Sequence, residues 1–98
     1  MTVANSIREK LTEAFAPDTL TIVDESAAHA GHAGARPEGE THFRVRIVSR
    51  VFDGLTRVER QRRVYAILAE ELRGRVHALA LVTQTPGEAG LGNGSSAT

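Results

Sequence analysis

Residues 42–48 read His-Phe-Arg-Val-Arg-Ile-Val, and this stretch decides the fold. Its apolar side chains alternate with those of Arg44 and Arg46. A period of two places the apolar residues on one face of a β-strand and the arginines on the other. The pattern therefore predicts a half-buried strand whose apolar face packs on a core and whose arginines point to solvent.

Two further elements precede this strand. Apolar residues recur at helical spacing over residues 2–15 and stop before Pro17, which predicts an amphipathic helix. Residues 19–26 begin with alternating threonine and apolar side chains and end in charged ones, as in a short strand. Residues 27–39 are rich in Ala, Gly and His and show neither period, so a loop is predicted there.

A helix and a third strand are predicted after it. Thr56 and Glu59 have the spacing of a capping box, which predicts a helix over residues 57–73 that Gly74 ends. The apolar residues expected on its core face are Val58, Val64, Tyr65, Ile67, Leu68, Ala69 and Leu72. Residues 76–83 are almost continuously apolar and predict a strand. Residues 87–98 have the composition of a flexible tail, so residues 1–86 form the predicted domain.

This order of helix, strand, strand, helix and strand predicts an α+β fold with a three-stranded mixed sheet. The first two strands can pair antiparallel across their loop. A helix joins the second strand to the third, as expected of parallel neighbours with a right-handed crossover. Both helices then lie on one face of the sheet.

The predicted topology brings four histidines to one end of the sheet. His29 and His32 lie in the loop that leads to the second strand, His42 opens that strand, and His77 lies at the start of the third. Each has an ordinary alternative, because loop histidines are often solvated and strand histidines are often packed. The spacing of His29 and His32 alone makes a weak zinc site.

Composition excludes several kinds of function. The chain has 98 residues, no cysteine, and 12 basic residues against 12 acidic ones. Thiolate nucleophiles and self-sufficient cysteine-ligated metal sites are therefore excluded. No Ser-His-Asp pattern or phosphate loop is present, and we expect no enzymatic activity. No apolar stretch approaches the ~20 residues of a membrane span, so a cytoplasmic protein without a membrane partner is expected.

Four arginines gather at the start of the predicted long helix: Arg57, Arg60, Arg62 and Arg63. Cations there oppose the helix dipole by ~0.3 to 1 kcal/mol each, which suggests that they bind a partner. That partner is DNA phosphate or an acidic protein or glutathione surface, and the alternative is a solvated face. The zero net charge argues against DNA binding as the main activity.

Several blocks of the sequence resemble one known family. They are Asp24-Glu25-Ser26, Gly39-Glu40-Thr41-His42-Phe43, Leu68-Ala69-Glu70-Glu71-Leu72 and Val76-His77-Ala78-Leu79. Their order and spacing, over roughly residues 5–86, resemble the BolA family. The resemblance implies a fold similar to a type II KH domain. It also implies a non-enzymatic partner of a monothiol glutaredoxin in iron-sulfur cluster assembly, transfer or iron sensing, with a DNA-binding transcriptional regulator as the alternative.

In the function that this resemblance implies, a [2Fe-2S] cluster is shared with the glutaredoxin and glutathione. His77 would be one ligand, and His29 would be the second, with His32 as the close alternative. No cofactor is expected in the isolated chain, which would be a monomer or a weak homodimer. One departure from the family is Gln61, which stands where many members carry a histidine.

Overall fold

The computed structural model describes residues 2–25 and 41–90. In chain order its elements are α1 (Val3–Phe15), β1 (Thr19–Asp24), β2 (His42–Val48), the 3-10 turn η2 (Arg50–Phe52), α2 (Arg57–Ile67), α3 (Ala69–Arg73), β3 (Ala78–Gln84) and α4 (Pro86–Ala89). The loop predicted at residues 27–39 lies outside the described residues, and so does the chain after residue 90.

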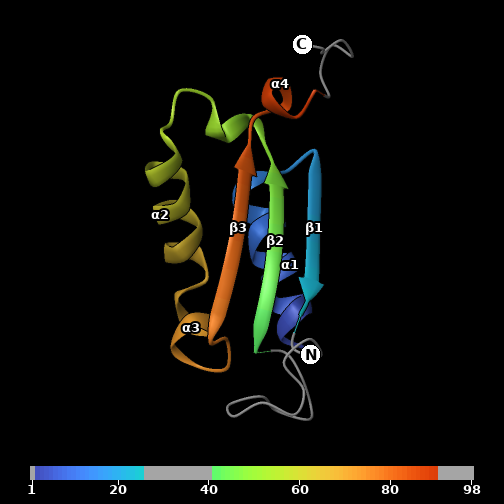
Figure 1. Ribbon diagram of the computed structural model, residues 1–98, viewed down its shortest axis with the longest axis vertical. Coiled ribbons are helices and arrows are strands. Elements are labelled where there is room, and N and C mark those ends of the chain that lie inside the picture. Colours follow the sequence, from blue (N-terminus) through green and yellow to red (C-terminus); the bar gives the residue numbers. More distant parts are fainter. Residues whose placement is uncertain (1, 26–40, 91–98) are drawn as a thin grey trace.

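The three strands form one mixed sheet in the order β1-β2-β3 (Figure 1). β1 pairs antiparallel with β2, with Thr19 opposite Val48, and β2 pairs parallel with β3, with His42 opposite Ala78. The predicted α+β class and both strand pairings are confirmed. α1 and α2 pack on the same face of the sheet, and no described helix covers the opposite face.

The core lies between the helices and the apolar face of β2. Its buried side chains are Ile7, Leu11, Phe15, Phe43, Val45, Ile47, Phe52, Val64, Leu68 and Val76. The Phe15 and Phe52 rings contact each other with centroids 5.1 Å apart. Nearby, the buried Ser49 hydroxyl donates to the Phe15 carbonyl at 2.6 Å and accepts from the Val51 amide at 3.1 Å. This residue therefore joins the end of α1 to the end of β2.

The predicted helix over residues 57–73 is wrong in two respects. It is broken at Leu68, whose φ of −99° and ψ of 20° separate α2 from α3. Leu68 is buried at the break, and Glu71 of α3 pairs with Lys10 of α1. The predicted core residues Val58 and Tyr65 are exposed, because the face of α2 that packs inward carries Arg60 and Val64 instead.

The chain also departs from the predicted tail directly after Pro86. Thr85 and Glu88 form a second capping box, and this box opens the four-residue helix α4. Gly90 ends the helix with φ of 77°, a conformation that glycine adopts readily. Among the described residues, no helix has both the length and the apolar character needed to cross a membrane.

Candidate functional site

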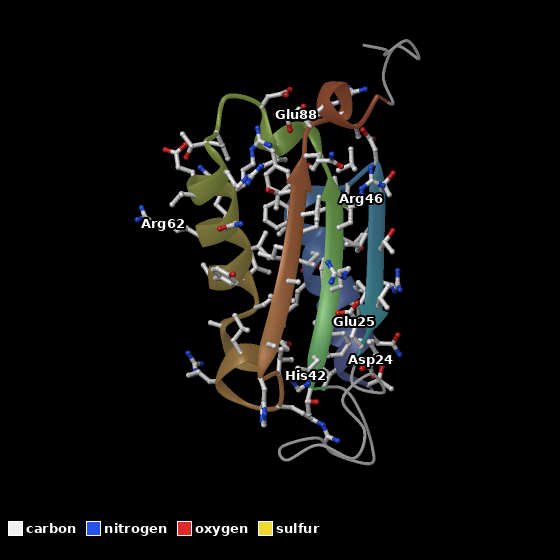
Figure 2. All side chains as sticks on the ribbon, in the orientation of Figure 1. Asp24, Glu25, His42, Arg46, Arg62 and Glu88 are labelled. Carbon is white, nitrogen blue, oxygen red and sulfur yellow. The ribbon has the colours of Figure 1, made fainter. Side chains whose placement is uncertain are left out.

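His42 and His77 lie together at one end of the sheet. β2 and β3 are parallel, so both begin at this end, where His42 opens β2 and His77 directly precedes β3. Their ring centroids are 6.3 Å apart. His77 is exposed and His42 is half-buried at the lower end of β2 in Figure 2. The predicted meeting of these two histidines is confirmed.

Thr41 holds this end of the sheet together. Its carbonyl accepts hydrogen bonds from the His77 amide at 2.7 Å and the Ala78 amide at 3.2 Å. Its hydroxyl lies 2.8 Å from Nδ1 of His42, so a hydrogen bond orients that ring. Across the sheet, the Glu25 amide donates to the His42 carbonyl at 2.7 Å. Residues 26–40 therefore leave and rejoin the described chain beside the two histidines.

α3 fixes the turn that leads into His77. Lys10 of α1 binds the carboxylates of Glu70 and Glu71 at 3.0 and 2.9 Å, and the Ser6 hydroxyl donates to Glu71 at 2.7 Å. Burial alone would raise the pKa of Glu71, but hydrogen bonds from Lys10 and Ser6 outweigh it and hold this pKa below its ordinary value. The Glu71 carbonyl accepts from the Val76 amide at 3.0 Å. These contacts connect the position of His77 to α1.

The described residues do not complete a metal site by themselves. They contain no group of three or more His, Cys, Asp or Glu side chains placed to hold a metal ion. His42 and His77 present two imidazoles, which are good ligands for iron, zinc and copper. A metal ion bound here would need further donors from outside the described residues. His29 and His32, predicted as loop ligands, lie outside the described residues.

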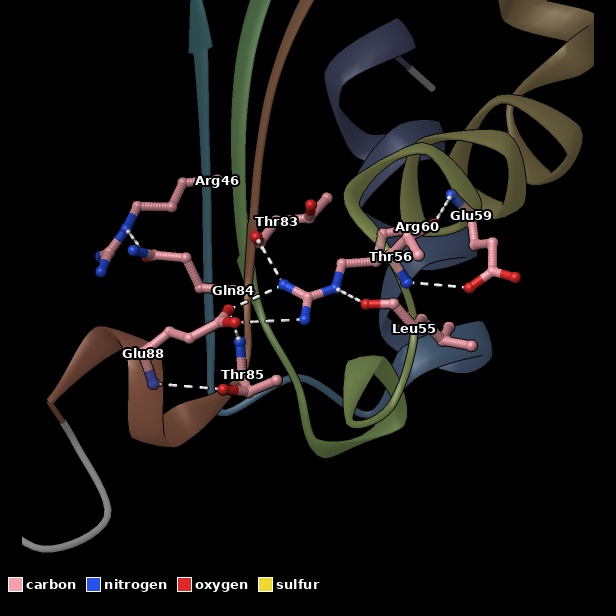
Figure 3. A network of polar contacts seen from close by, with 9 residues as sticks. All are labelled: Arg46, Leu55, Thr56, Glu59, Arg60, Thr83, Gln84, Thr85 and Glu88. Atoms are coloured by element: carbon pink, nitrogen blue, oxygen red, sulfur yellow. Dashed lines mark hydrogen bonds and ion pairs between the residues drawn. The ribbon is translucent and has the colours of Figure 1, made fainter.

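Arg60 is a structural residue, which corrects its predicted role in partner binding. Its Nε donates to the Leu55 carbonyl at 3.0 Å and its Nη1 to the Thr83 carbonyl at 3.2 Å. The Glu88 carboxylate accepts from Nη1 at 2.7 Å and from Nη2 at 3.2 Å (Figure 3). The hydrogen bond from Arg60 lowers the pKa of Glu88. Because these internal acceptors use its donors, Arg60 joins α2, β3 and α4.

The other three arginines of the predicted cluster remain on the surface. Arg57, Arg62 and Arg63 are exposed and form no ion pair with a described residue. Figure 2 shows Arg62 pointing away from the sheet on the outer side of α2. The sequence carried a signal for α4, because Thr85 and Glu88 have capping-box spacing around Pro86, but none for the contact of Glu88 with Arg60.

Comparison with known proteins identifies the family. A family model described as BolA-like protein matches residues 11–88, and the chain belongs to this BolA-like family. Protein BOLA1, chloroplastic, of Arabidopsis thaliana is 49% identical over 87 residues, which cover 87% of this chain and 54% of that protein. BolA-like protein 1 of Homo sapiens is 49% identical over 86 residues, which cover 88% of this chain and 60% of that protein. The chain thus spans little more than half the length of these two relatives.

A bacterial relative and two solved structures extend the comparison. The Escherichia coli protein named DNA-binding transcriptional regulator BolA is 47% identical over 85 residues, with 87% of this chain and 77% of that protein covered. The structure of BolA1 from Arabidopsis thaliana matches with a TM-score of 0.81 at 47% identity, over 90% of this chain and 96% of that one. The BolA domain of SufE1 from the same plant matches with a TM-score of 0.77 at 45% identity, over 87% and 93%. The names of the human and bacterial relatives describe a BolA-like protein and a regulator, and neither describes an enzyme.

Proposed function

We propose that this chain is a non-enzymatic partner of a monothiol glutaredoxin and that His77 supplies a ligand to a [2Fe-2S] cluster held between the two proteins. One observation carries the proposal. His77 is exposed directly before β3, beside His42, at the sheet end where residues 26–40 leave and rejoin the described chain. Membership of the BolA-like family supports it.

The donors on this chain fit a shared cluster better than a resident one. The chain has no cysteine, so the thiolates that such clusters need would come from the glutaredoxin and from glutathione. Imidazole is then the side chain here best suited to the second iron. Imidazoles in place of thiolates on one iron would raise the reduction potential of the cluster relative to all-thiolate ligation.

The second ligand from this chain is proposed to be His29, with His32 as the alternative. His29 is four residues beyond Glu25, so chain length alone keeps its Cα within about 14 Å of the Cα of Glu25. His32 is seven residues beyond Glu25, which allows a reach of about 25 Å. Both residues are therefore within reach of this end of the sheet, and the preference for His29 rests on the family resemblance, in which its spacing from Ser26 matches the loop ligand best.

The test is to mix the chain with a monothiol glutaredoxin, glutathione, iron and sulfide and to record the visible spectrum of the complex. We expect a heterodimer whose spectrum differs from that of the glutaredoxin cluster alone. His77→Ala should keep the fold, because the side chain is exposed, and should abolish this difference. His29→Ala should weaken or shift the spectrum, and His32→Ala should do less. An unchanged spectrum with His77→Ala would show that His77 is not a ligand.

DNA binding is the second candidate function. Arg57, Arg62 and Arg63 are exposed without an ion pair to any described residue, and the Escherichia coli relative is named as a DNA-binding regulator. The type II KH-like fold, which stays a prediction, would suit nucleic acid. If DNA binding is the function, changing all three arginines to glutamine should abolish it. The wild-type affinity should also fall steeply with salt. A plot of the logarithm of the binding constant against the logarithm of the salt concentration should have a slope of about −0.9 for each phosphate contact.

A further inference from the structure

The outer edge of β3 carries backbone groups that no other described strand uses. Within residues 2–25 and 41–90, β3 pairs only with β2, so it is an edge strand of the described sheet. The Gln84 carbonyl accepts from the Ser49 amide, and the Ala78 amide donates to the Thr41 carbonyl. The even-numbered residues of β3 therefore direct their N–H and C=O groups toward β2. Leu79, Leu81 and Thr83 therefore direct theirs outward, as the bond from Arg60 to the Thr83 carbonyl confirms.

A groove lies along this edge. It has a volume of about 220 Å³ and is lined by Arg57 and Gln61 from α2 and by Leu81, Val82, Thr83 and Gln84 from β3. The outward N–H and C=O of Leu81 form no hydrogen bond with any described residue. A segment lying in this groove could therefore pair with the edge strand, as in recognition by strand addition.

Exposed apolar side chains lie close to the groove: Val58 and Tyr65 on α2, and Val82 of β3, whose side chain lies on the sheet face opposite to Leu81. Val58 and Tyr65 precede and follow Gln61 by three and four positions, so they continue its side of α2. Val58 is 53% exposed, Tyr65 41% and Val82 40%. They are three of the five large hydrophobic side chains exposed in the part of the chain that the structure describes. Exposed tyrosine and arginine side chains are both typical of protein interfaces.

Charge indicates what the groove would bind. Arg57 lies in it without an ion pair to a described carboxylate, although its charge adds to the hydrogen bond from Arg60 in lowering the pKa of Glu88. Arg62 points away from the sheet and does not add to this charge. We infer that the β3 edge accepts an extended, carboxylate-bearing segment of the partner protein, which adds to the sheet as a fourth strand. The inference rests on the proposed function for the identity of that partner, the monothiol glutaredoxin. The exposed apolar side chains near the groove favour a protein segment over DNA, because valine side chains cannot bind phosphate groups.

The test uses the full ¹⁵N-labelled chain with apo monothiol glutaredoxin as the probe, without iron or sulfide. Amide hydrogen exchange is measured by NMR with and without saturating glutaredoxin. We expect exchange at Leu79, Leu81 and Thr83 to slow by at least about tenfold, because free edge amides become hydrogen-bonded. Ile22 is the internal control. The Glu25 amide faces β2, where it donates to the His42 carbonyl, and the direction of the backbone groups alternates along a strand. The amide of Ile22 therefore faces the outer edge of β1.

Variants test the groove itself. Arg57→Glu and Tyr65→Ser should each weaken glutaredoxin binding, measured by calorimetry, by at least about tenfold. Arg8→Glu makes the same charge change on the exposed side of α1 and should leave the affinity within about twofold. Thermal melts of the variants check that each one folds. His77→Ala should also bind apo glutaredoxin normally, because docking and cluster ligation are separate contributions.

The outcomes separate the two proposals. If the wild type binds glutaredoxin while Leu81 stays unprotected, or if Arg57→Glu binds equally well, docking at the β3 edge is wrong and the proposed function stands. If wild-type protein does not bind glutaredoxin at all, the proposed function is wrong and this inference with it. Protection of Leu81 that grows with the concentration of the chain alone would assign the edge to a second copy and would also overturn the inference.

Discussion

At the scale of single residues, Arg57 and Arg60 differ in role although both lie in the first turn of α2. Arg57 is exposed, whereas Arg60 is buried against Phe52, with its guanidinium carbon 5.8 Å from the ring centroid. Its donors reach two carbonyls and the Glu88 carboxylate. A position in a charged cluster therefore does not identify a binding residue, because burial and available acceptors decide where each guanidinium lies.

This difference predicts opposite effects on stability. Arg60→Gln should lower the free energy of unfolding by about 2 kcal/mol, because buried acceptors lose a charged donor. Changing Arg57, Arg62 and Arg63 together to glutamine should leave the stability level or slightly higher, because all three are exposed and Arg57, in the first turn, opposes the helix dipole by ~0.3 to 1 kcal/mol. Urea unfolding of both proteins measures the contrast. Equal destabilisation by the two changes would contradict the structural role of Arg60.

At the scale of elements, α4 is a four-residue helix that depends on one distant contact. Its capping box uses Glu88 both to accept from the Thr85 amide at 2.9 Å and to bind Arg60. Pro86 opens the helix with the φ that a first helical turn needs. The helix lies at the end of the sheet where β2 and β3 finish, opposite to the end where both strands begin and the two histidines lie (Figure 1).

Two truncations test whether α4 belongs to the domain. Removing residues 87–98 deletes Glu88 and leaves Arg60 without its carboxylate, so the melting temperature should fall by roughly 4 to 8 °C. Removing only residues 91–98 is the matched control, because it keeps α4. Their composition offers little apolar surface, and the change should stay below roughly 2 °C. A small effect of the longer deletion would restore the domain end predicted at residue 86.

At the scale of the whole molecule, two carboxylates make stability depend on pH. Hydrogen bonds from Arg60 lower the pKa of Glu88, and those from Lys10 and Ser6 outweigh burial to lower the pKa of Glu71. A carboxylate with a lowered folded-state pKa binds fewer protons when folded than when unfolded. Its contribution is therefore present above the unfolded pKa of ~4.3 and is lost as the pH falls through the folded pKa.

We predict that the free energy of unfolding, measured in urea between pH 7 and pH 3, falls steeply below about pH 4.3. Glu71→Gln should lower stability at pH 7 and flatten this fall, because the link from α1 to α3 no longer titrates. Glu13→Gln is the matched control on the exposed side of α1 and should leave the profile unchanged. An equally steep fall in both variants would show that Glu71 does not set the acid limit.

The sequence by itself determined the α+β class, the strand pairings and the end of the sheet where His42 and His77 meet. These features follow from local properties of the chain. Residues 42–48 show the side-chain period of a strand, and Thr56 shows the spacing of a helix cap. The absence of cysteine likewise limits the chemistry that this chain can carry out alone, whatever its fold.

Only the tertiary structure decided the break at Leu68, the burial of Arg60 and the exposure of Val58 and Tyr65. The contact of Arg60 with Glu88 joins residues 28 positions apart, and that of Lys10 with Glu70 joins residues 60 positions apart. Such contacts depend on how the helices pack on the sheet. No periodicity within a single segment contains that information, because the energy of each contact is set by a partner that only the folded chain brings near.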